Sequence, residues 1–256
     1  MQNPKNIFKS RLTQAGCQIG VWNAIGGNTV PEALASIGYD WICIDTEHAA
    51  VETVEVLPAL QSIAAYPNTS AIVRPAANDP VLFKRILDMG AQSLLVPYIE
   101  TAKEARVAID AMRYGPTGIR GTAGMTRATR YGRIGDYFKL AEKELCLVVQ
   151  IETVKGISNL EEIAKTDGVD AIFFGPADLS ASMGLPGEMD HPEVLATIES
   201  AVEKLKEMDV PFGTMALSHT GAERFIELGA AFVAVAVDSV SMVGALMQIR
   251  NHFKSD

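Results

Sequence analysis

The strongest constraint on the fold is a repeated phrase in which an apolar helix ends at a glycine and an apolar strand follows. The phrase occurs as LASIGYDWICI, LDMGAQSLLV and IELGAAFVAV, with Gly38, Gly90 and Gly229 at the expected helix ends. Glycine is favoured just past a helix because it adopts left-handed backbone angles without strain. A chain that alternates helices with short apolar strands in this way predicts a parallel α/β architecture.

Eight apolar runs are the expected strands. Several of them, such as WICI, CLVVQI and FVAVAV, are apolar at consecutive positions, which is typical of strands buried on both faces. The expected strands are 16–22, 41–45, 71–74, 93–97, 146–152, 171–175, 211–215 and 232–237. The expected helices are 31–37, 54–65, 80–89, 102–112, 160–165, 192–208, 222–228 and 242–253.

Eight αβ units predict a closed (β/α)₈ barrel, or TIM barrel, in one domain that covers residues 1–256. The length suits this fold, since α/β barrels commonly run to about 250 residues. A doubly wound open sheet is the alternative, but no G-x-G-x-x-G motif follows the first expected strand.

One arginine-rich excursion, residues 114–143, interrupts the alternation between the fourth helix and the fifth strand. Arg113 precedes it, and Arg120, Arg127, Arg130 and Arg133 lie within it. The segment is too long for a simple connection. Two interpretations stay open: a surface excursion with one short helix near 136–143, or a functional segment that forms either a subunit contact or an edge of the active site.

Charge and composition exclude several classes of partner. The net charge of −9 argues against nucleic acid or an anionic membrane, both of which bind clustered lysine and arginine. We find no signal peptide and no apolar run long enough to span a membrane. Cys17, Cys43 and Cys146 lie in or beside apolar runs and are expected to be buried free thiols. These features predict a cytoplasmic protein.

Carboxylates follow the fifth and sixth expected strands at the barrel face where active sites lie. Glu152 ends strand five, Gln150 lies two residues before it on the same strand face, and Asp178 follows strand six. Neighbouring strands are about 4.8 Å apart, so both carboxylates can reach one ion at about 2.1 Å. The pair predicts a site for Mg²⁺ or Mn²⁺, with Co²⁺ or Zn²⁺ also compatible. The alternative is that each carboxylate caps a helix or pairs with an arginine.

Two further strands end in ionisable residues. Asp45 and His48 follow strand two and form a candidate acid–base pair, with Glu47 as the competing partner of the histidine. Arg74 ends strand three, where a buried guanidinium needs an anion such as a carboxylate or a developing enolate. No lysine ends a strand, which argues against Schiff-base chemistry.

The turn Gly175-Pro176-Ala177-Asp178 precedes a short expected helix. Backbone N–H groups at such a turn bind a carboxylate or phosphate well. We therefore expect this turn to contact an anionic substrate beside the ion.

Together these motifs resemble the HpcH/HpaI aldolase family, relatives of the citrate lyase β-subunit group. The resemblance covers nearly the whole chain, and its most specific stretches are QIET and GPADLS. The other matching stretches are GYDWICIDTEH, VRP with NDP, LDMGAQSLLVPYIE, RYGPTGIRG, HPEV and LGAAFVAVAVD.

The resemblance implies a metal-dependent class II pyruvate aldolase that is usually a homohexamer, with the last helix exchanged between barrels. It implies that Glu152 and Asp178 bind the metal, that Gln150 contacts a metal-bound water, and that Arg74 contacts the keto oxygen of the substrate. It also implies that His48 transfers protons together with Asp45, and that the backbone of Ala177 and Asp178 holds the substrate carboxylate. Trp22 and Met215 are the implied pocket walls.

The expected reaction is reversible cleavage of a 4-hydroxy-2-oxo acid to pyruvate and an aldehyde through a metal-stabilised enolate. A citramalyl- or malyl-CoA type lyase is the alternative enzyme, and a non-catalytic barrel subunit is the alternative from another class. The chain departs from the family pattern at Thr46, at Ala50 and in 213–219 after strand seven. These positions lie around the expected pocket, so they leave the aldehyde acceptor open.

Overall fold

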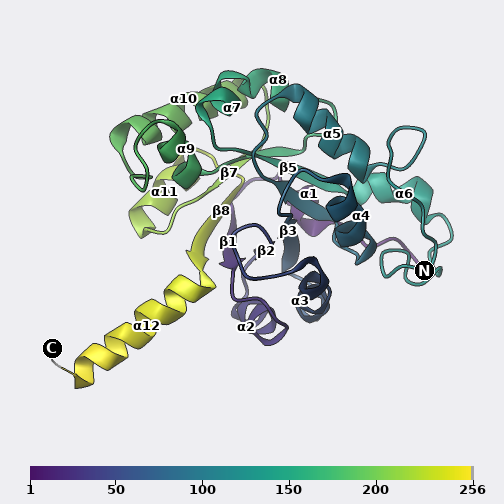
Figure 1. The fold of residues 1–256 in the computed structure, drawn as a ribbon, viewed down its shortest axis with the longest axis horizontal. Coiled ribbons are helices and arrows are strands. Elements are labelled where there is room, and N and C mark those ends of the chain that lie inside the picture. The colour runs from purple at the N-terminus through teal and green to yellow at the C-terminus, as the bar shows by residue number, and fades with distance from the viewer. Residues whose placement is uncertain (255–256) are drawn as a thin grey trace.

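The structure is a computed structural model that describes residues 1–254, and its centre is a closed barrel of eight parallel strands (Figure 1). Each strand pairs with the next, and β1 pairs with β8 to close the ring. The TIM-barrel prediction is therefore confirmed. The strands are β1 Gln18–Asn23, β2 Trp41–Asp45, β3 Ser70–Arg74, β4 Ser93–Val96, β5 Cys146–Ile151, β6 Ala171–Phe174, β7 Phe212–Met215 and β8 Phe232–Val237.

Helices surround the barrel and connect successive strands (Figure 1). They are α1 Ile7–Arg11, α2 Thr29–Ile37, the 3₁₀ turn η1 Thr53–Glu55, α3 Val56–Ile63, α4 Pro80–Asp88, α5 Ala102–Met112, α6 Tyr137–Glu144, α7 Val154–Ser158, α8 Leu160–Ala164, α9 Pro176–Ser182, α10 Pro192–Glu207, α11 His219–Glu227 and α12 Asp238–Phe253.

All eight expected helices are present, but α12 begins at Asp238, four residues before its expected start at Met242. The apolar pattern becomes visible only in the second turn, which explains the difference. α1 and α7 were not expected. Each has five residues, too few to show a helical period.

Local capping explains several helix boundaries. Asp79 accepts hydrogen bonds from the backbone of Val81 and Leu82, and Pro80 occupies the first turn of α4. Thr101 and Glu104 form a reciprocal capping box at the start of α5. Gly38 ends α2 with a φ of 96°, the left-handed conformation expected there.

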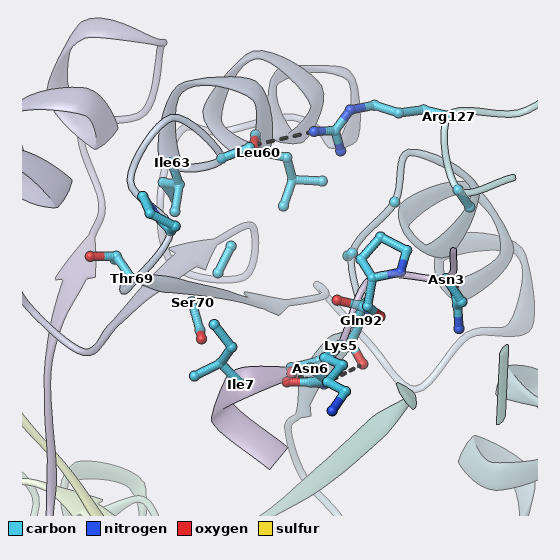
Figure 2. Close-up of a pocket in the computed structure, with 18 of the residues that line it drawn as sticks. Asn3, Lys5, Asn6, Ile7, Leu60, Ile63, Thr69, Ser70, Gln92 and Arg127 are labelled. Atoms are coloured by element: carbon cyan, nitrogen blue, oxygen red, sulfur yellow. Dashed lines mark hydrogen bonds between the residues drawn. The ribbon is translucent and has the colours of Figure 1, made fainter. Parts of the chain in front are cut away.

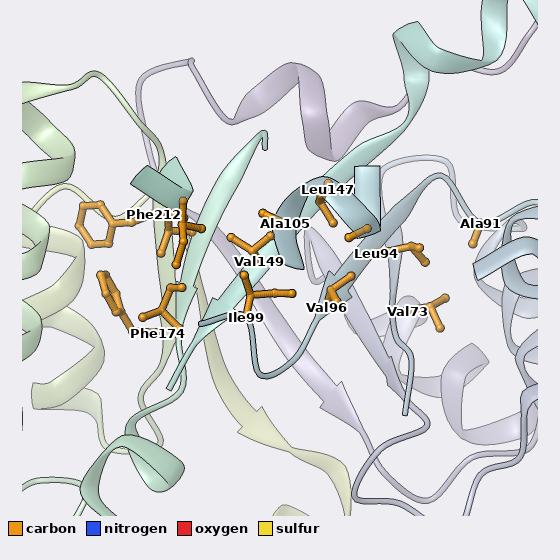
Figure 3. Packing of buried hydrophobic residues seen from close by; sticks show 14 of the residues in the cluster. Val73, Ala91, Leu94, Val96, Ile99, Ala105, Leu147, Val149, Phe174 and Phe212 are labelled. Atoms are coloured by element: carbon orange, nitrogen blue, oxygen red, sulfur yellow. The ribbon is translucent and has the colours of Figure 1, made fainter. Parts of the chain in front are cut away.

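Side chains alternate between two environments along each strand. In β2, Trp41 and Cys43 lie in the cluster inside the barrel, whereas Ile42 and Ile44 lie in the larger cluster that the helices cover. Figure 3 shows part of that outer layer, with Val73, Val96 and Val149 from three strands. Because the period is two, the next inward position on β2 is Asp45. The same parity places the last residues of several strands at the mouth of the barrel.

Aromatic rings fill the interior below that mouth. Phe8 from α1 lies 5.1 Å from Phe232 and 6.0 Å from Trp41, measured between ring centroids. Phe173 lies 6.1 Å from Phe232 and 5.6 Å from Trp22. The short helix α1 therefore closes the end of the barrel where the strands begin, and the interior is packed rather than open.

α12 leaves the barrel and projects away from it (Figure 1). Its root is fixed because buried Asp238 accepts hydrogen bonds from the Asn23 side chain and from the backbone of Ala24 and Ile25. Beyond the root its large apolar side chains are exposed: Val240, Met242, Val243, Leu246, Met247, Ile249 and Phe253. Within residues 1–254, no helix has the length and apolar character required to cross a bilayer.

The close packing inside the barrel leads to a stability prediction for Gly20. A Cβ atom at this position would overlap the indole ring of Trp41. We expect Gly20→Ala to cost about 1–3 kcal/mol and to lower the Tm by several degrees, because a packed core cannot absorb the added carbon. Thermal unfolding measures the change. Gly135→Ala is the matched control, since nothing lies within 4 Å of its added Cβ. Equal Tm values for the two variants would contradict the argument.

Candidate active site

A buried ion-pair network occupies the mouth of the barrel between β2 and β3. Arg74 donates from Nε to Asp45 Oδ1 at 2.9 Å and from Nη2 to Asp45 Oδ2 at 2.7 Å. Its Nη1 lies 2.8 Å from Glu47 Oε2, and its guanidinium lies 5.0 Å from the ring of Trp22. Asp45 and Arg74 are register partners on adjacent strands, so the sheet itself brings them together. This bidentate pair fixes the guanidinium in one orientation.

The network shifts the pKa values of its members in opposite directions. Burial by itself would raise the pKa of Asp45, but the hydrogen bonds and charge of Arg74, together with the backbone N–H groups of Glu47 and His48, outweigh it and lower that pKa. Burial would likewise lower the pKa of Arg74, but the hydrogen bonds and charge of Asp45, together with the charge of Glu47, outweigh it and raise that pKa. Burial raises the pKa of Glu47 despite the nearby guanidinium. Arg74 and Asp45 therefore stay charged, and Glu47 carries its charge less readily.

Glu152 is a buried carboxylate without a cationic partner among residues 1–254. Its side chain is 2% exposed, and its Oε1 accepts a hydrogen bond from the backbone N–H of Tyr98 at 2.8 Å. Its Oε2 accepts a hydrogen bond from Gln150 Nε2. Burial outweighs these hydrogen bonds and raises the pKa of Glu152 to about 7, with further contributions from the charges of Asp178 and Glu47. A buried acid surrounded by other carboxylates is an environment that a cation stabilises.

Gly175 makes room for this carboxylate at the end of β6. A Cβ atom at Gly175 would lie 2.6 Å from Glu152 Oε2 and 3.0 Å from Gln150 Nε2. Pro176 then begins α9, and Asp178 lies in its first turn. This short connection between β6 and α9 holds Asp178 near Glu152, consistent with the effect of the charge of Asp178 on the pKa of Glu152. The N–H groups in the first turn of α9 have no carbonyl partner within the helix, so they are available to a substrate anion.

The donor set fits a divalent cation. Asp45, Glu47, Glu152 and Asp178 are four carboxyl groups beside one guanidinium, that of Arg74. The buried Gln150 Oε1 has no hydrogen-bond partner in the described part of the chain. No group of three or more His, Cys, Asp or Glu side chains in residues 1–254 is arranged to enclose an ion. Two carboxylates with open positions for water and substrate are the arrangement that Mg²⁺ and Mn²⁺ accept.

His48 lies at the outer edge of this site. Its side chain is 61% exposed, and its Nε2 is 3.8 Å from Glu47 Oε2. Asp45 contacts the histidine only through the backbone N–H of His48, at 3.4 Å. The side chain of Asp45 is occupied by Arg74, so Glu47 is the carboxylate nearest the imidazole. The proton-transfer role expected of His48 and Asp45 stays a prediction.

Comparison with known proteins identifies the family of this chain. Residues 18–245 match the family described as HpcH/HpaI aldolase/citrate lyase. The chain belongs to this family. A pyruvate aldolase of Rhizobium etli is 49% identical over 238 residues, covering 93% of each chain. A hydroxypyruvate/pyruvate aldolase of Sagittula stellata is 48% identical over 250 residues, covering 98% of each chain.

A solved structure supports the same assignment. An HpcH/HpaI aldolase/citrate lyase family protein from Burkholderia cenocepacia J2315 superposes with a TM-score of 0.94 at 36% identity, covering 98% of this chain and all of the other (100%). The family resemblance inferred from QIET and GPADLS is therefore confirmed.

Other residues that the HpcH/HpaI resemblance implicates lie around the same mouth. Trp22 is buried between Arg74 and Phe173, and Met215 is half-buried at the end of β7. Thr46 is buried, and its hydroxyl donates to the carbonyl oxygen of Arg74 at 2.7 Å. That bond ties the loop after β2 to β3 and uses the one proton that the Thr46 hydroxyl can donate.

Sequence reasoning missed Tyr98. This residue has a φ of 54°, the left-handed conformation that is uncommon outside glycine, and there its N–H reaches Glu152. Its exposed ring and Glu47 line a cavity of about 520 Å³ beside the carboxylates. The only local signal is the preceding Pro97, which does not indicate a left-handed residue.

The raised pKa of Glu152 predicts a pH-dependent loss of stability in the metal-free protein. The pKa of about 7 in the folded chain exceeds the ordinary value of 4.5, so the folded state holds a proton that the unfolded state releases between these values. Stability therefore falls as the pH rises from about 4.5 to about 7, by on the order of 3 kcal/mol.

Glu152→Gln removes this titration and measures its effect. In EDTA, we expect the variant to match wild type near pH 5 and to have a higher Tm near pH 8. Glu223→Gln, an exposed carboxylate on α11, is the control and should follow wild type at both pH values. A constant difference between Glu152→Gln and wild type across this range would contradict the assignment.

Proposed function

We propose that this chain is a metal-dependent class II aldolase that cleaves a 4-hydroxy-2-oxo acid to pyruvate and an aldehyde, and catalyses the reverse addition. The supporting observation is the buried carboxylate Glu152, which lies beside Asp178 and has no cation among its neighbours in residues 1–254. Family membership and the names of its relatives agree with this carbon–carbon lyase chemistry. We further propose that residues 1–256 form one catalytic domain.

Glu152 and Asp178 would hold the ion, and Gln150 would orient a water molecule bound there. When bound, the divalent ion supplies Lewis-acid stabilisation for the charge that develops on the keto oxygen. Mg²⁺ or Mn²⁺ suits two carboxylates best, and Co²⁺ or Zn²⁺ is compatible with the same donors. The N–H groups of Ala177 and Asp178, after Gly175 and Pro176, would hold the substrate carboxylate.

Arg74 would provide a second, fixed positive charge beside the keto oxygen of the substrate. Its two hydrogen bonds to Asp45 prevent the guanidinium from turning as charge develops. A pre-oriented donor stabilises a developing enolate without reorganisation, which is a large contribution to catalysis in buried sites. Asp45 therefore acts in this proposal mainly by orienting Arg74.

His48 is the proposed proton acceptor. In the cleavage direction the 4-hydroxyl loses its proton through a water molecule to His48, and the C3–C4 bond breaks. The electron pair of that bond forms the pyruvate enolate, and the oxygen at C4 becomes the aldehyde carbonyl. Protonation at C3 then completes pyruvate. Glu47 is the carboxylate nearest the imidazole, with its Oε2 3.8 Å from His48 Nε2.

Substitution of Glu152 tests the metal assignment. We expect Glu152→Gln to lower Mn²⁺- or Mg²⁺-dependent pyruvate release by more than about 100-fold, because the amide binds a hard cation poorly. Glu100→Gln is the matched control: Glu100 lies near the end of β4 and pairs with Lys155 at 2.8 Å. Its activity should stay close to wild type. Pyruvate release from Glu152→Gln that equals wild type, with and without added metal, would refute the metal role.

We also propose that the enzyme is a homo-oligomer, a hexamer by resemblance, in which α12 packs on a neighbouring subunit. The seven large apolar side chains exposed on α12 beyond Asp238 support this proposal. Such a surface is costly in water and is typical of a subunit contact.

Light scattering after gel filtration tests the assembly. We expect a mass of about six times the 27.5 kDa chain. Leu246→Asp on α12 should yield smaller species, because a carboxylate would be buried at the contact. Ile37→Asp, which also replaces an exposed apolar residue, should leave the mass unchanged. A monomeric wild-type chain would contradict the proposal.

A further inference from the structure

The arginines in and just before the excursion between α5 and β5 differ in whether a carboxylate pairs with them. Arg113 pairs with Glu142 at 2.8 Å and with Asp167 at 3.2 Å, and buried Arg120 pairs with Asp88 at 2.8 Å. Arg127, Arg130 and Arg133 have no carboxylate partner in residues 1–254; Arg133 is exposed, whereas Arg127 and Arg130 are half-buried. Half-buried guanidinium groups in a chain of net charge −9 would ordinarily find an acid.

The two half-buried arginines line one cavity of about 250 Å³ at the end of the barrel where the strands begin. Figure 2 shows Arg127 on its wall. The N-terminal segment, the end of α3 and the starts of β3 and β4 form its other walls, and Lys5 adds a third cation. The lining contains no aspartate or glutamate. The cavity is thus positively charged without compensation, in contrast to the acidic mouth at the opposite end of the strands.

The contacts of Arg127 explain how this charge is held in place. Its Nη1 donates to the carbonyl oxygen of Met89 at 2.8 Å, and Nη2 reaches that of Leu60 at 3.5 Å. These carbonyls lie at or near the ends of α4 and α3, so they position the guanidinium but do not neutralise it. Burial and the charge of Arg130 both lower the pKa of Arg127. A bound anion would relieve both effects.

We propose that this cavity binds a phosphate group, either as inorganic phosphate or as part of a small phosphorylated metabolite. Arginine suits a phosphate because its planar donors match the phosphate oxygens. Lys5 and the hydroxyl of Ser70, which has no hydrogen-bond partner of its own in residues 1–254, complete a set of donors on the cavity wall. The dianion matches the excess positive charge.

The site lies at the opposite end of the barrel from Glu152. Ser70 begins β3 at the cavity, and Arg74 ends the same strand at the candidate active site. In (β/α)₈ barrels the chemistry takes place where the strands end, and residues at the face where the strands begin contribute to stability. We therefore expect phosphate to stabilise the folded chain without altering the aldol reaction.

Thermal unfolding and calorimetry of the full chain in EDTA test the proposal with inorganic phosphate and glycerol 3-phosphate as probes. At about ten times Kd, phosphate should raise the wild-type Tm by roughly 3 °C. Arg130→Gln should weaken binding at least about tenfold, because it removes a charge-assisted hydrogen bond. Arg133→Gln carries the same charge change outside the cavity lining and should bind like wild type. Tighter binding of the ester assigns the site to a phosphorylated metabolite, and equal binding assigns it to the inorganic ion.

Three results would overturn the proposal. One is an unchanged wild-type Tm in phosphate, and another is an equal loss of binding in Arg130→Gln and Arg133→Gln. The third is loss of binding in Arg74→Gln with full binding in Arg130→Gln, which would place the anion in the catalytic mouth, where Arg74 is the fixed cation. If Arg130→Gln does not fold, Lys5→Gln, an exposed position, replaces it with the same expectation. None of these readouts depends on aldolase activity.

Discussion

The candidate active site depends on the packing of four aromatic side chains inside the barrel, directly below the polar residues at the strand ends. Phe8, Trp41, Phe173 and Phe232 fill the interior, and the backbone approaches these rings closely at Gly20 and Gly213. This filling excludes water from the lower interior. The polar residues at the strand ends therefore rest on an apolar floor, where charges interact more strongly than they would in bulk water.

On that floor, the two sides of the mouth are electrostatically different. Arg74 and Asp45 neutralise each other on adjacent strands, and their pKa values move apart so that both remain charged. Across the mouth, Glu152 has hydrogen-bond donors but no cation, and its pKa rises instead. The mouth thus has one fixed positive charge, on Arg74, and a buried carboxylate, Glu152, that a second positive charge would stabilise. An enolate oxygen between them would be stabilised from both sides.

The opposite end of the barrel shows the reverse imbalance. Arg127 and Arg130 line a cavity that has cations and no acid. Arg113, just before the excursion, and Arg120, within it, form ion pairs that attach this segment to the barrel. The root of α12, in contrast, lies at the end of the barrel that carries the candidate active site. Asp238 binds the loop that follows Trp22, so the root of the exposed helix and the wall of the pocket are held by the same carboxylate. A subunit that packs on α12 would therefore act close to the site.

The pattern of apolar runs and glycines was sufficient to predict the barrel and the candidate residues at its mouth. Period-two alternation and the strand ends were enough to place Asp45, Arg74, Gln150 and Glu152 at one mouth, because strand parity is a local property. The tertiary structure decided the pairings. It joined Asp45 to Arg74 and left Glu47 as the acid nearest His48, since long side chains choose partners only after the register is formed. It also set Tyr98 against Glu152, α1 against Phe232 and Arg127 at a cavity wall. These contacts join segments far apart in the chain, and neither a left-handed residue nor a five-residue helix produces a sequence period from which it could be predicted.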